Sequence, residues 1–92
     1  MTKTATLIQD NLPDFNGHAA LYRCEPPLQD YDENKHEYVV VSAVHDSCIY
    51  ETYIFPSDIT GAVTDWLELP GSMKNTVSHE YVLTNLDYIV KH

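Results

Sequence analysis

Histidines have the widest chemical range of any residue in this chain, because imidazole titrates near neutral pH and is a common metal ligand. The five histidines are His18, His36, His45, His79 and His92. No two of them have the HxH or HxxxH spacing that would bring two ligands onto one face of a strand or helix. The pair His45-Asp46 is typical of a turn, and His79, beside Glu80, is expected on the surface or the half-buried side of a helix. The sequence therefore predicts no metal-binding residues.

The acidic stretch at residues 29–37 copies part of a calcium-binding loop. Asp30-x-Asp32-x-Asn34 has the spacing of the first three ligands. The sixth position of such a loop requires glycine and is Lys35 here, and the twelfth requires glutamate and is Val41. We therefore expect a solvated acidic loop, which is also a candidate partner contact.

Nucleophilic side chains lack the surroundings that catalysis requires. Cys24 and Cys48 are far apart without CxxC spacing, and a reducing cytoplasm would keep both as free thiols. The chain has no GxSxG motif, and its three glycines are too few for a phosphate-binding loop. We therefore predict a non-enzymatic protein with no catalytic residues, no cofactor-binding residues and no cofactor.

Aromatic residues are the most distinctive part of the composition, with seven tyrosines and one tryptophan in 92 residues. Both residue types give large amphipathic contact areas and are enriched at interface centres. In the strand predicted at 49–55, residues 50, 52 and 54 share one face and residues 51, 53 and 55 the other, and one face must meet the helix. The predicted partner-binding residues are Tyr31, Asp32, Glu33, Tyr50, Tyr53 and Trp66.

The net charge of −9, from fourteen acidic and five basic residues, disfavours binding to DNA and to anionic lipid. The acids are scattered and do not follow the charge spacing of a duplex, so an acidic nucleic-acid mimic is an alternative only. The N-terminal residues contain no apolar stretch of signal-peptide length, and no run approaches a membrane span. We expect a protein of the cytoplasm that neither binds nucleic acid directly nor inserts into membranes.

The patterning predicts a single α+β domain over residues 1–92: an antiparallel sheet of four or five strands, with one C-terminal helix packed on one face. Strands are expected at 4–8, 18–24, 37–44 and 49–55, with a brief one at 63–66 and a last one at 88–90. Residues 37–44 are apolar on both faces and predict a central strand, with Val39 and Val41 facing the core. Pro26-Pro27 is expected to end the second strand. Turns are expected at 45–47, at 57–61 and, as type II, at 69–72, and Asn75 or Thr76 is expected to cap a helix that stops near 85–87.

Several segments resemble one known group of proteins. HEYVVVSAV at 36–44, ETYIFP at 51–56, Asp65-Trp66, ELPGS at 68–72 and Ser78-His79-Glu80 resemble a family of small proteins of unknown function from bacteriophages of actinobacteria, mycobacteriophages among them. The resemblance covers residues 17–90. This chain has Asp87 where the family has glycine after the helix, and Lys74-Asn75-Thr76 where it often has Gly-Gly. The resemblance implies a small accessory protein made in an infected or lysogenic bacterium, and it transfers no catalytic residue.

The sequence leaves three functions open. The first is a phage protein in the host cytoplasm that binds a host or phage protein through an aromatic sheet face with an acidic rim, in host takeover, superinfection exclusion or defence evasion. The second is a small-molecule sponge, for instance for a nucleotide, in which Tyr and Trp would stack a base but only five cations are available for phosphates. The third is the acidic mimic. A weak homodimer through the aromatic face is also left open.

Overall fold

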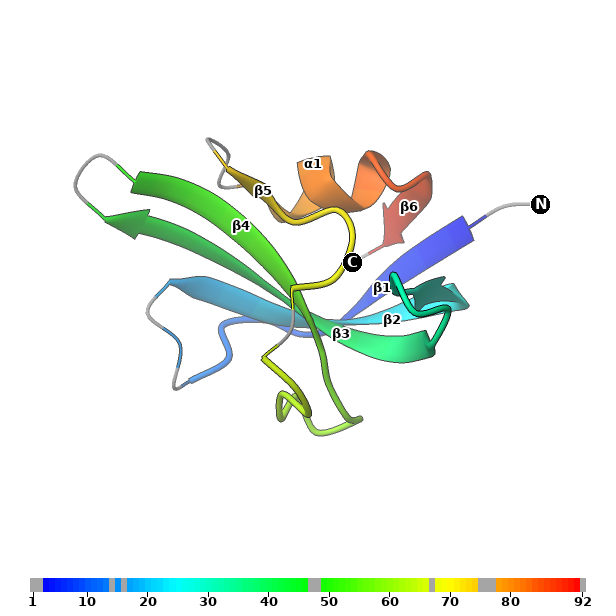
Figure 1. The fold of residues 1–92 in the computed structure, drawn as a ribbon. Coiled ribbons are helices and arrows are strands. Elements are labelled where there is room, and N and C mark those ends of the chain that lie inside the picture. The colour runs from blue at the N-terminus through cyan, green and yellow to red at the C-terminus, as the bar shows by residue number, and fades with distance from the viewer. Residues whose placement is uncertain are drawn as a thin grey trace.

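The computed structural model describes residues 3–13, 15, 17–46, 49–66, 68–74 and 78–91. Within these residues, six strands and one helix follow one another in sequence (Figure 1). They are β1 (Lys3–Gln9), β2 (His18–Gln29), β3 (Lys35–Asp46), β4 (Ile49–Pro56), β5 (Met73–Lys74), α1 (His79–Thr84) and β6 (Tyr88–Lys91). The expected α+β class is confirmed, and no described helix is long and apolar enough to span a membrane.

The sheet is mixed, and the prediction of a purely antiparallel sheet is wrong. Its strand order is β5-β4-β3-β2-β1-β6, with β5 contributing only two residues. Neighbours are antiparallel except β1 and β6, which run parallel with Lys3 opposite Tyr88. The helix lies between β5 and β6 in sequence, so the chain crosses over the sheet and enters β6 beside β1 in the same direction.

The central position of β3 is confirmed. It lies between β2 and β4, and Val39, Val40 and Val41 are fully buried. Val39 and Val41 belong to the cluster beneath the helix, whereas Val40 belongs to the cluster on the opposite face. A strand covered on both faces is apolar on both faces, which is the pattern that residues 38–41 show.

Strand β2 continues through Pro26 and Pro27, so the prediction that they end it is wrong. The β2–β3 register shifts between Arg23 and Leu28, and the prolines lie in this irregular stretch. A proline is tolerated there because the ladder does not require its missing N–H. Strand β3 also extends further than expected, since His45 and Asp46 pair with Tyr50 and Ile49. Of the turn predicted at 45–47, residue 47 lies outside the described residues, as does Cys48.

The helix is short and begins later than expected. Ser78 is its N-cap, with the side chain accepting a hydrogen bond from the Tyr81 amide, while Asn75 and Thr76 lie outside the described residues. After the helix, Asp87 has φ 69°, the left-handed conformation expected where the resembling family has glycine. The turn at 69–72 is confirmed by Gly71 at φ 102° and by the Ser72 amide donating to the Leu69 carbonyl.

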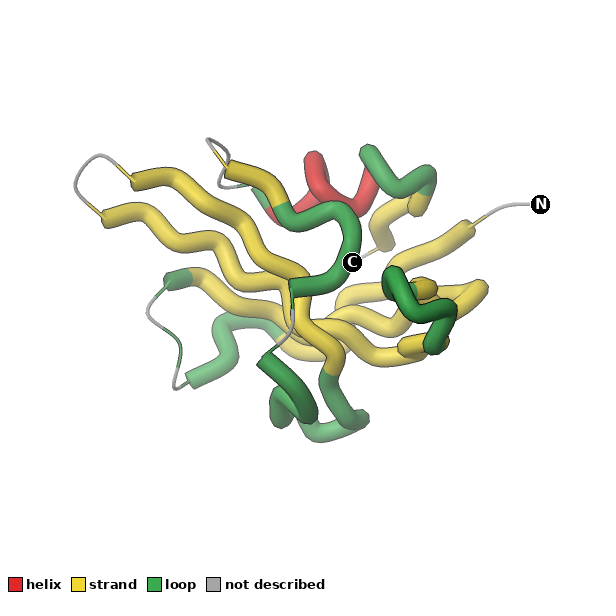
Figure 2. Tube along the Cα trace, viewed as in Figure 1, coloured by secondary structure: helices red, strands yellow, loops and turns green. Residues whose placement is uncertain are grey.

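The two faces of the sheet are covered differently (Figures 1 and 2). On the helix face, Val82 and Leu83 of α1 pack on Ala20, Val41 and Ile54. The opposite face, called the loop face here, has no helix among the described residues and is covered by the β1–β2 and β4–β5 connections. Its smaller cluster contains Leu12, Ala19, Leu21 and Val40, with Phe15, Tyr38 and Val63 against it. Residues 63–66 form no strand, contrary to expectation, and contribute only an isolated bridge between Ser57 and Val63.

Candidate functional site

The acidic turn between β2 and β3 uses its own carboxylate internally. The Asp30 side chain accepts hydrogen bonds from the amides of Asp32 and Asn34 and from His36 Nε2, each at 2.9 Å. These bonds, the His36 bond foremost, hold the pKa of Asp30 below its ordinary value. The calcium-like spacing therefore closes a turn around Asp30, as expected for an Asx motif.

The same turn displays three of the predicted partner-binding residues. Tyr31 is 78% exposed, and Asp32 and Glu33 are exposed beside it. Glu33 has φ 67°, which closes the tight connection into β3. Tyr31 therefore lies at a hairpin end.

Tyr50 and Tyr53 lie on opposite faces of β4. Tyr50 lies on the same face of β4 as Ile54, which is buried beneath the helix. Tyr50 itself is 42% exposed near the start of the strand. Tyr53 is half-buried and pairs with Ser42 on the loop face. The two tyrosines therefore do not form one surface.

Four rings on the loop face form a chain of contacts, called the aromatic cluster here. The ring of Trp66 lies 5.2 Å from Phe55, edge to face, and 6.0 Å from Phe15. Phe55 in turn stacks with Tyr53 at 5.9 Å. Trp66 nevertheless remains 66% exposed. The structure thus brings together Tyr53 and Trp66 of the predicted set and adds Phe15 and Phe55, which had not been predicted.

A pocket of about 380 Å³, called the loop pocket here, adjoins the aromatic cluster. Its walls come from the two connections and include Leu12, Pro13, Phe15, Gly61, Val63 and Trp66. Asp58 shapes one wall, because its carboxylate accepts hydrogen bonds from the amides of Thr60 and Ala62. Gly61 has φ 90°, and a Cβ there would lie 3.1 Å from Leu12. The loop pocket is therefore apolar and held by hydrogen bonds within its own loop.

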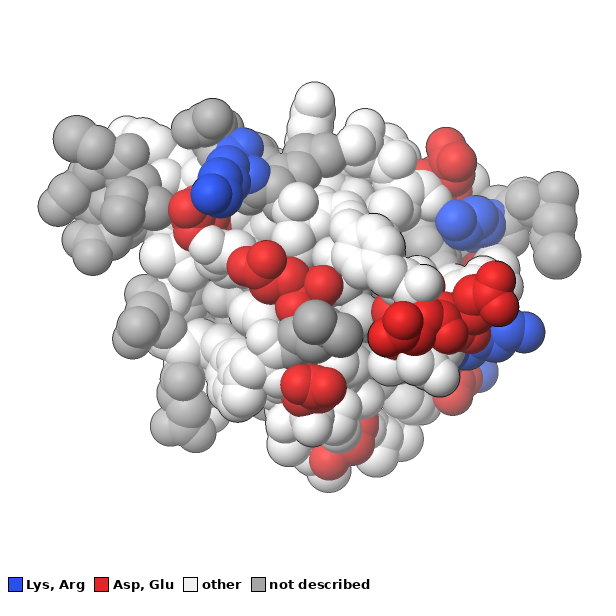
Figure 3. Space-filling view, in the orientation of Figure 1, with Lys and Arg blue, Asp and Glu red and all other residues white. Residues whose placement is uncertain are grey.

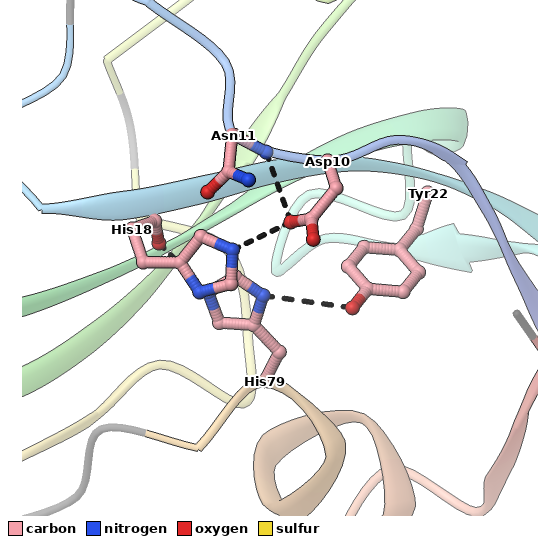
Figure 4. A network of polar contacts seen from close by, with 5 residues as sticks. All are labelled: Asp10, Asn11, His18, Tyr22 and His79. Atoms are coloured by element: carbon pink, nitrogen blue, oxygen red, sulfur yellow. Dashed lines mark hydrogen bonds and ion pairs between the residues drawn. The ribbon is translucent and has the colours of Figure 1, made fainter.

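A second constellation, called the histidine cluster here, joins the helix to the sheet (Figure 4). The rings of His18 from β2 and His79 from α1 stack with centroids 4.5 Å apart and an interplanar angle of 22°. His79 Nε2 donates to the backbone carbonyl of His18 at 2.8 Å, since a carbonyl only accepts. Its Nδ1 then accepts from the Tyr22 hydroxyl at 3.5 Å, and His18 Nε2 donates to Asp10 at 2.5 Å.

Burial and hydrogen bonding set the charges of the histidine cluster. Burial is the main cause that lowers the pKa of His79; the hydrogen bond to the His18 carbonyl opposes this shift, and the charge of the adjacent His18 ring adds to the lowering. The hydrogen bond from His18 lowers the pKa of Asp10, and burial raises the pKa of Tyr22 to about 12. At neutral pH the buried ring of His79 is therefore an uncharged tautomer with hydrogen on Nε2.

The chemistry available to the histidine cluster is limited to proton transfer at an exposed site. Asp10 orients His18 as a carboxylate orients a general base, and the two line an open pocket of about 260 Å³ with Ser78 and Glu80. As the helix N-cap, Ser78 Oγ already accepts a hydrogen bond from the Tyr81 amide. The described residues contain no group of three or more His, Cys, Asp or Glu side chains able to hold a metal. The arrangement supports a structural clamp between α1 and β2.

Sequence reasoning could not find this cluster. His18 and His79 are far apart in sequence and share no motif, so only the docking of α1 on the sheet brings their rings together. The helical position predicted for His79 is confirmed, since it is the first residue of α1, but His79 is buried rather than on the surface or half-buried. Cys24 is buried as well, and burial raises the pKa of its thiol to about 12. A thiol with so high a pKa is a poor nucleophile.

Charge is distributed unevenly along the chain. Residues 36–73, which include most of β3 and all of β4 and the β4–β5 connection, contain six Asp or Glu residues and no Lys or Arg. Figure 3 shows carboxylates spread over the face drawn, with lysine and arginine in a few separate places. Arg23 on β2 is held by Glu25 at 3.0 Å and Glu37 at 2.9 Å. Lys3 donates to the Leu86 carbonyl and lies over the ring of Tyr88.

Comparison with known proteins gives no match: no protein-family model matches the chain, and neither curated proteins nor solved structures contain a significantly similar one. The resemblance to proteins of actinobacteriophages therefore stays a prediction.

Proposed function

We propose that this chain is a non-enzymatic interaction protein that binds another protein through the aromatic cluster and the loop pocket. The observation that supports this most is the exposure of Trp66. Its indole packs on Phe15 and Phe55 and yet leaves two thirds of its surface in water. A large exposed ring beside a preformed apolar pocket is the usual composition of an interface hot spot.

The resemblance to phage proteins adds a setting to this proposal. The chain would act in the cytoplasm of an infected or lysogenic bacterium, where it would bind a host or phage protein and change what that protein does. Interaction needs no catalytic group. It is also compatible with a histidine cluster whose hydrogen bonds link the helix to the sheet.

A displayed library of random peptides tests the proposal without knowledge of the partner. The library is panned on the wild-type chain, on Trp66→Ala and on Tyr81→Ala. Tyr81 is a matched control, since it is 58% exposed but lies on α1, over the other face of the sheet. We expect peptides that bind the wild type and Tyr81→Ala and lose binding to Trp66→Ala.

Two results would contradict the proposal. One is a panning that enriches no peptide on the wild type. The other is a set of peptides that bind all three proteins equally, since their site would then lie away from the aromatic cluster. Circular dichroism and urea denaturation of both variants show whether each is folded, and Trp66→Phe, which keeps an aromatic ring, replaces Trp66→Ala if the latter unfolds.

A further inference from the structure

We infer that the loop face binds a cationic segment of its protein partner, with an arginine or lysine side chain against Trp66 and a neighbouring apolar side chain in the loop pocket. This inference rests on the proposed function and names the chemistry of the partner. Three observations support it: the exposed indole of Trp66, the apolar loop pocket beside it, and the negative charge of the segments that form this face.

The segments around the aromatic cluster contain Asp and Glu but no Lys or Arg. Residues 36–73 contain six Asp or Glu residues and no Lys or Arg, and residues 4–22 also lack Lys and Arg. Of the acids in residues 4–22, Asp10 belongs to the histidine cluster, where it pairs with His18. Asp65 directly precedes Trp66, and both are exposed, as is Glu68. Arg23 also points to the loop face, since it pairs with Tyr38, but Glu25 and Glu37 hold its guanidinium. A cation approaching Trp66 is therefore attracted by the surrounding acids.

An exposed indole favours the same ligand. A guanidinium or ammonium group over an aromatic face is attracted by the ring quadrupole, and tryptophan is the best of the aromatic residues for this contact. Arginine has the further advantage that its planar group can stack on the ring while its N–H groups meet a carboxylate such as Asp65. The loop pocket, lined by Leu12, Pro13 and Val63, offers an adjoining place for an aliphatic side chain.

The same charges argue against other occupants. An anionic ligand such as a nucleic acid would meet carboxylates at this face, with no lysine or arginine in the segments that form the loop pocket. A second copy of this chain would bring the same acids against themselves. A basic protein segment removes this repulsion and covers the indole.

Peptide titrations test the inference directly. The probe is a short unstructured peptide in which arginine alternates with leucine, compared with versions in which citrulline or glutamate replaces arginine. Citrulline keeps the shape of arginine without its charge. Trp66 is the sole tryptophan of the chain, so its fluorescence reports binding at this position.

We expect the arginine peptide to bind about tenfold more tightly than the citrulline peptide and the glutamate peptide not to bind. Added salt should weaken the arginine peptide more than the citrulline peptide. Asp65→Asn together with Glu68→Gln should reduce the preference for arginine. Calorimetry with Trp66→Ala should show the loss of binding, and Tyr81→Ala should bind as the wild type does.

The outcomes separate this inference from the proposed function. Equal binding of the arginine and citrulline peptides would overturn the cationic partner, as would library peptides that depend on Trp66 but show no enrichment of arginine or lysine. Either result leaves the interaction function standing. A dimer seen by sedimentation that Trp66→Ala abolishes would make a second copy the occupant and would also overturn the inference. A library that enriches nothing on the wild type contradicts the proposed function itself.

Discussion

The substitution His79→Phe tests the clamp between helix and sheet. Phenylalanine preserves a ring stacked on His18 and touching Tyr22 but removes both nitrogens. At neutral pH the variant loses the 2.8 Å bond to the His18 carbonyl and leaves the hydroxyl of buried Tyr22 without its acceptor. A hydrogen bond contributes about 1 kcal/mol, and a buried polar group without a partner costs about 1–3 kcal/mol. Apolar burial of the new ring offsets part of this loss, so we expect a net destabilisation of about 1–2 kcal/mol.

The pH dependence of this difference is the sharper part of the prediction. Burial lowers the pKa of His79 in the folded chain, so the unfolded chain takes up the proton first as pH falls below the ordinary value of 6.5. The stability of the wild type therefore decreases with acidification from about pH 7 to pH 5, and the phenylalanine variant lacks this contribution. The gap between the two proteins should narrow over this range. Asp10, whose pKa is also lowered, loses its stabilising contribution only at lower pH, and does so in both proteins.

Urea denaturation followed by circular dichroism at several pH values measures the gap. His79→Gln is the companion variant, because its amide keeps a donor for the His18 carbonyl but does not titrate. It should lie closer to the wild type at neutral pH and share the weaker pH dependence of the phenylalanine variant. A gap between wild type and His79→Phe that stays constant or widens with acidification would refute the role assigned to the neutral ring.

Two further predictions concern the sheet. Val41→Asp places a carboxylate at a fully buried position of the central strand, which costs several kcal/mol against a total stability of about 5–15 kcal/mol. We therefore expect an insoluble or unfolded protein. A soluble variant that melts cooperatively would contradict the buried central position of β3. Gly17→Ala places a Cβ against the backbone carbonyl of Ala43, so the start of β2 must shift away from β3 and the melting temperature should fall. Gly61→Ala should destabilise the fold mainly through the positive φ of that position, because the nearest neighbour is the side chain of Leu12, which can move aside. An unchanged melting temperature for Gly17→Ala would show that the chain enters β2 by another path.

Local patterns predicted the parts of the fold that depend on local physics. Val39, Val40 and Val41 are apolar on both faces, and only a central strand buries both faces. Ser57–Gly61 and Leu69–Ser72 contain the Asp, Pro and Gly that turns require, and both turns form. The end of β2 predicted at Pro26-Pro27 was wrong, because an irregular stretch of the ladder accommodates residues that a regular one excludes.

Long-range features were not visible in the sequence. The parallel pairing of β1 with β6 depends on where the chain returns after α1, which no local pattern encodes. The approach of His18 and His79 depends on the same docking. For the aromatic cluster, alternation along β4 correctly separated Tyr50 from Tyr53, but it did not show which face the helix covers. Phe15 and Trp66 come from two connections whose meeting is set by tertiary packing alone.

The pairing of β1 with β6 has a consequence for the order in which the chain acquires its structure during synthesis. Strands β1 to β4 follow one another as antiparallel neighbours, so each can pair as soon as the next leaves the ribosome. The outer edge of β1 stays unpaired until Tyr88–Lys91 are made, because β6 is the last described strand of the chain. Until then its row of unpaired amides and carbonyls is open to strands of other nascent chains. A ribosome that pauses before β6 would therefore hold an intermediate in which β1 to β4 are paired and the outer edge of β1 is bare, a form prone to aggregate.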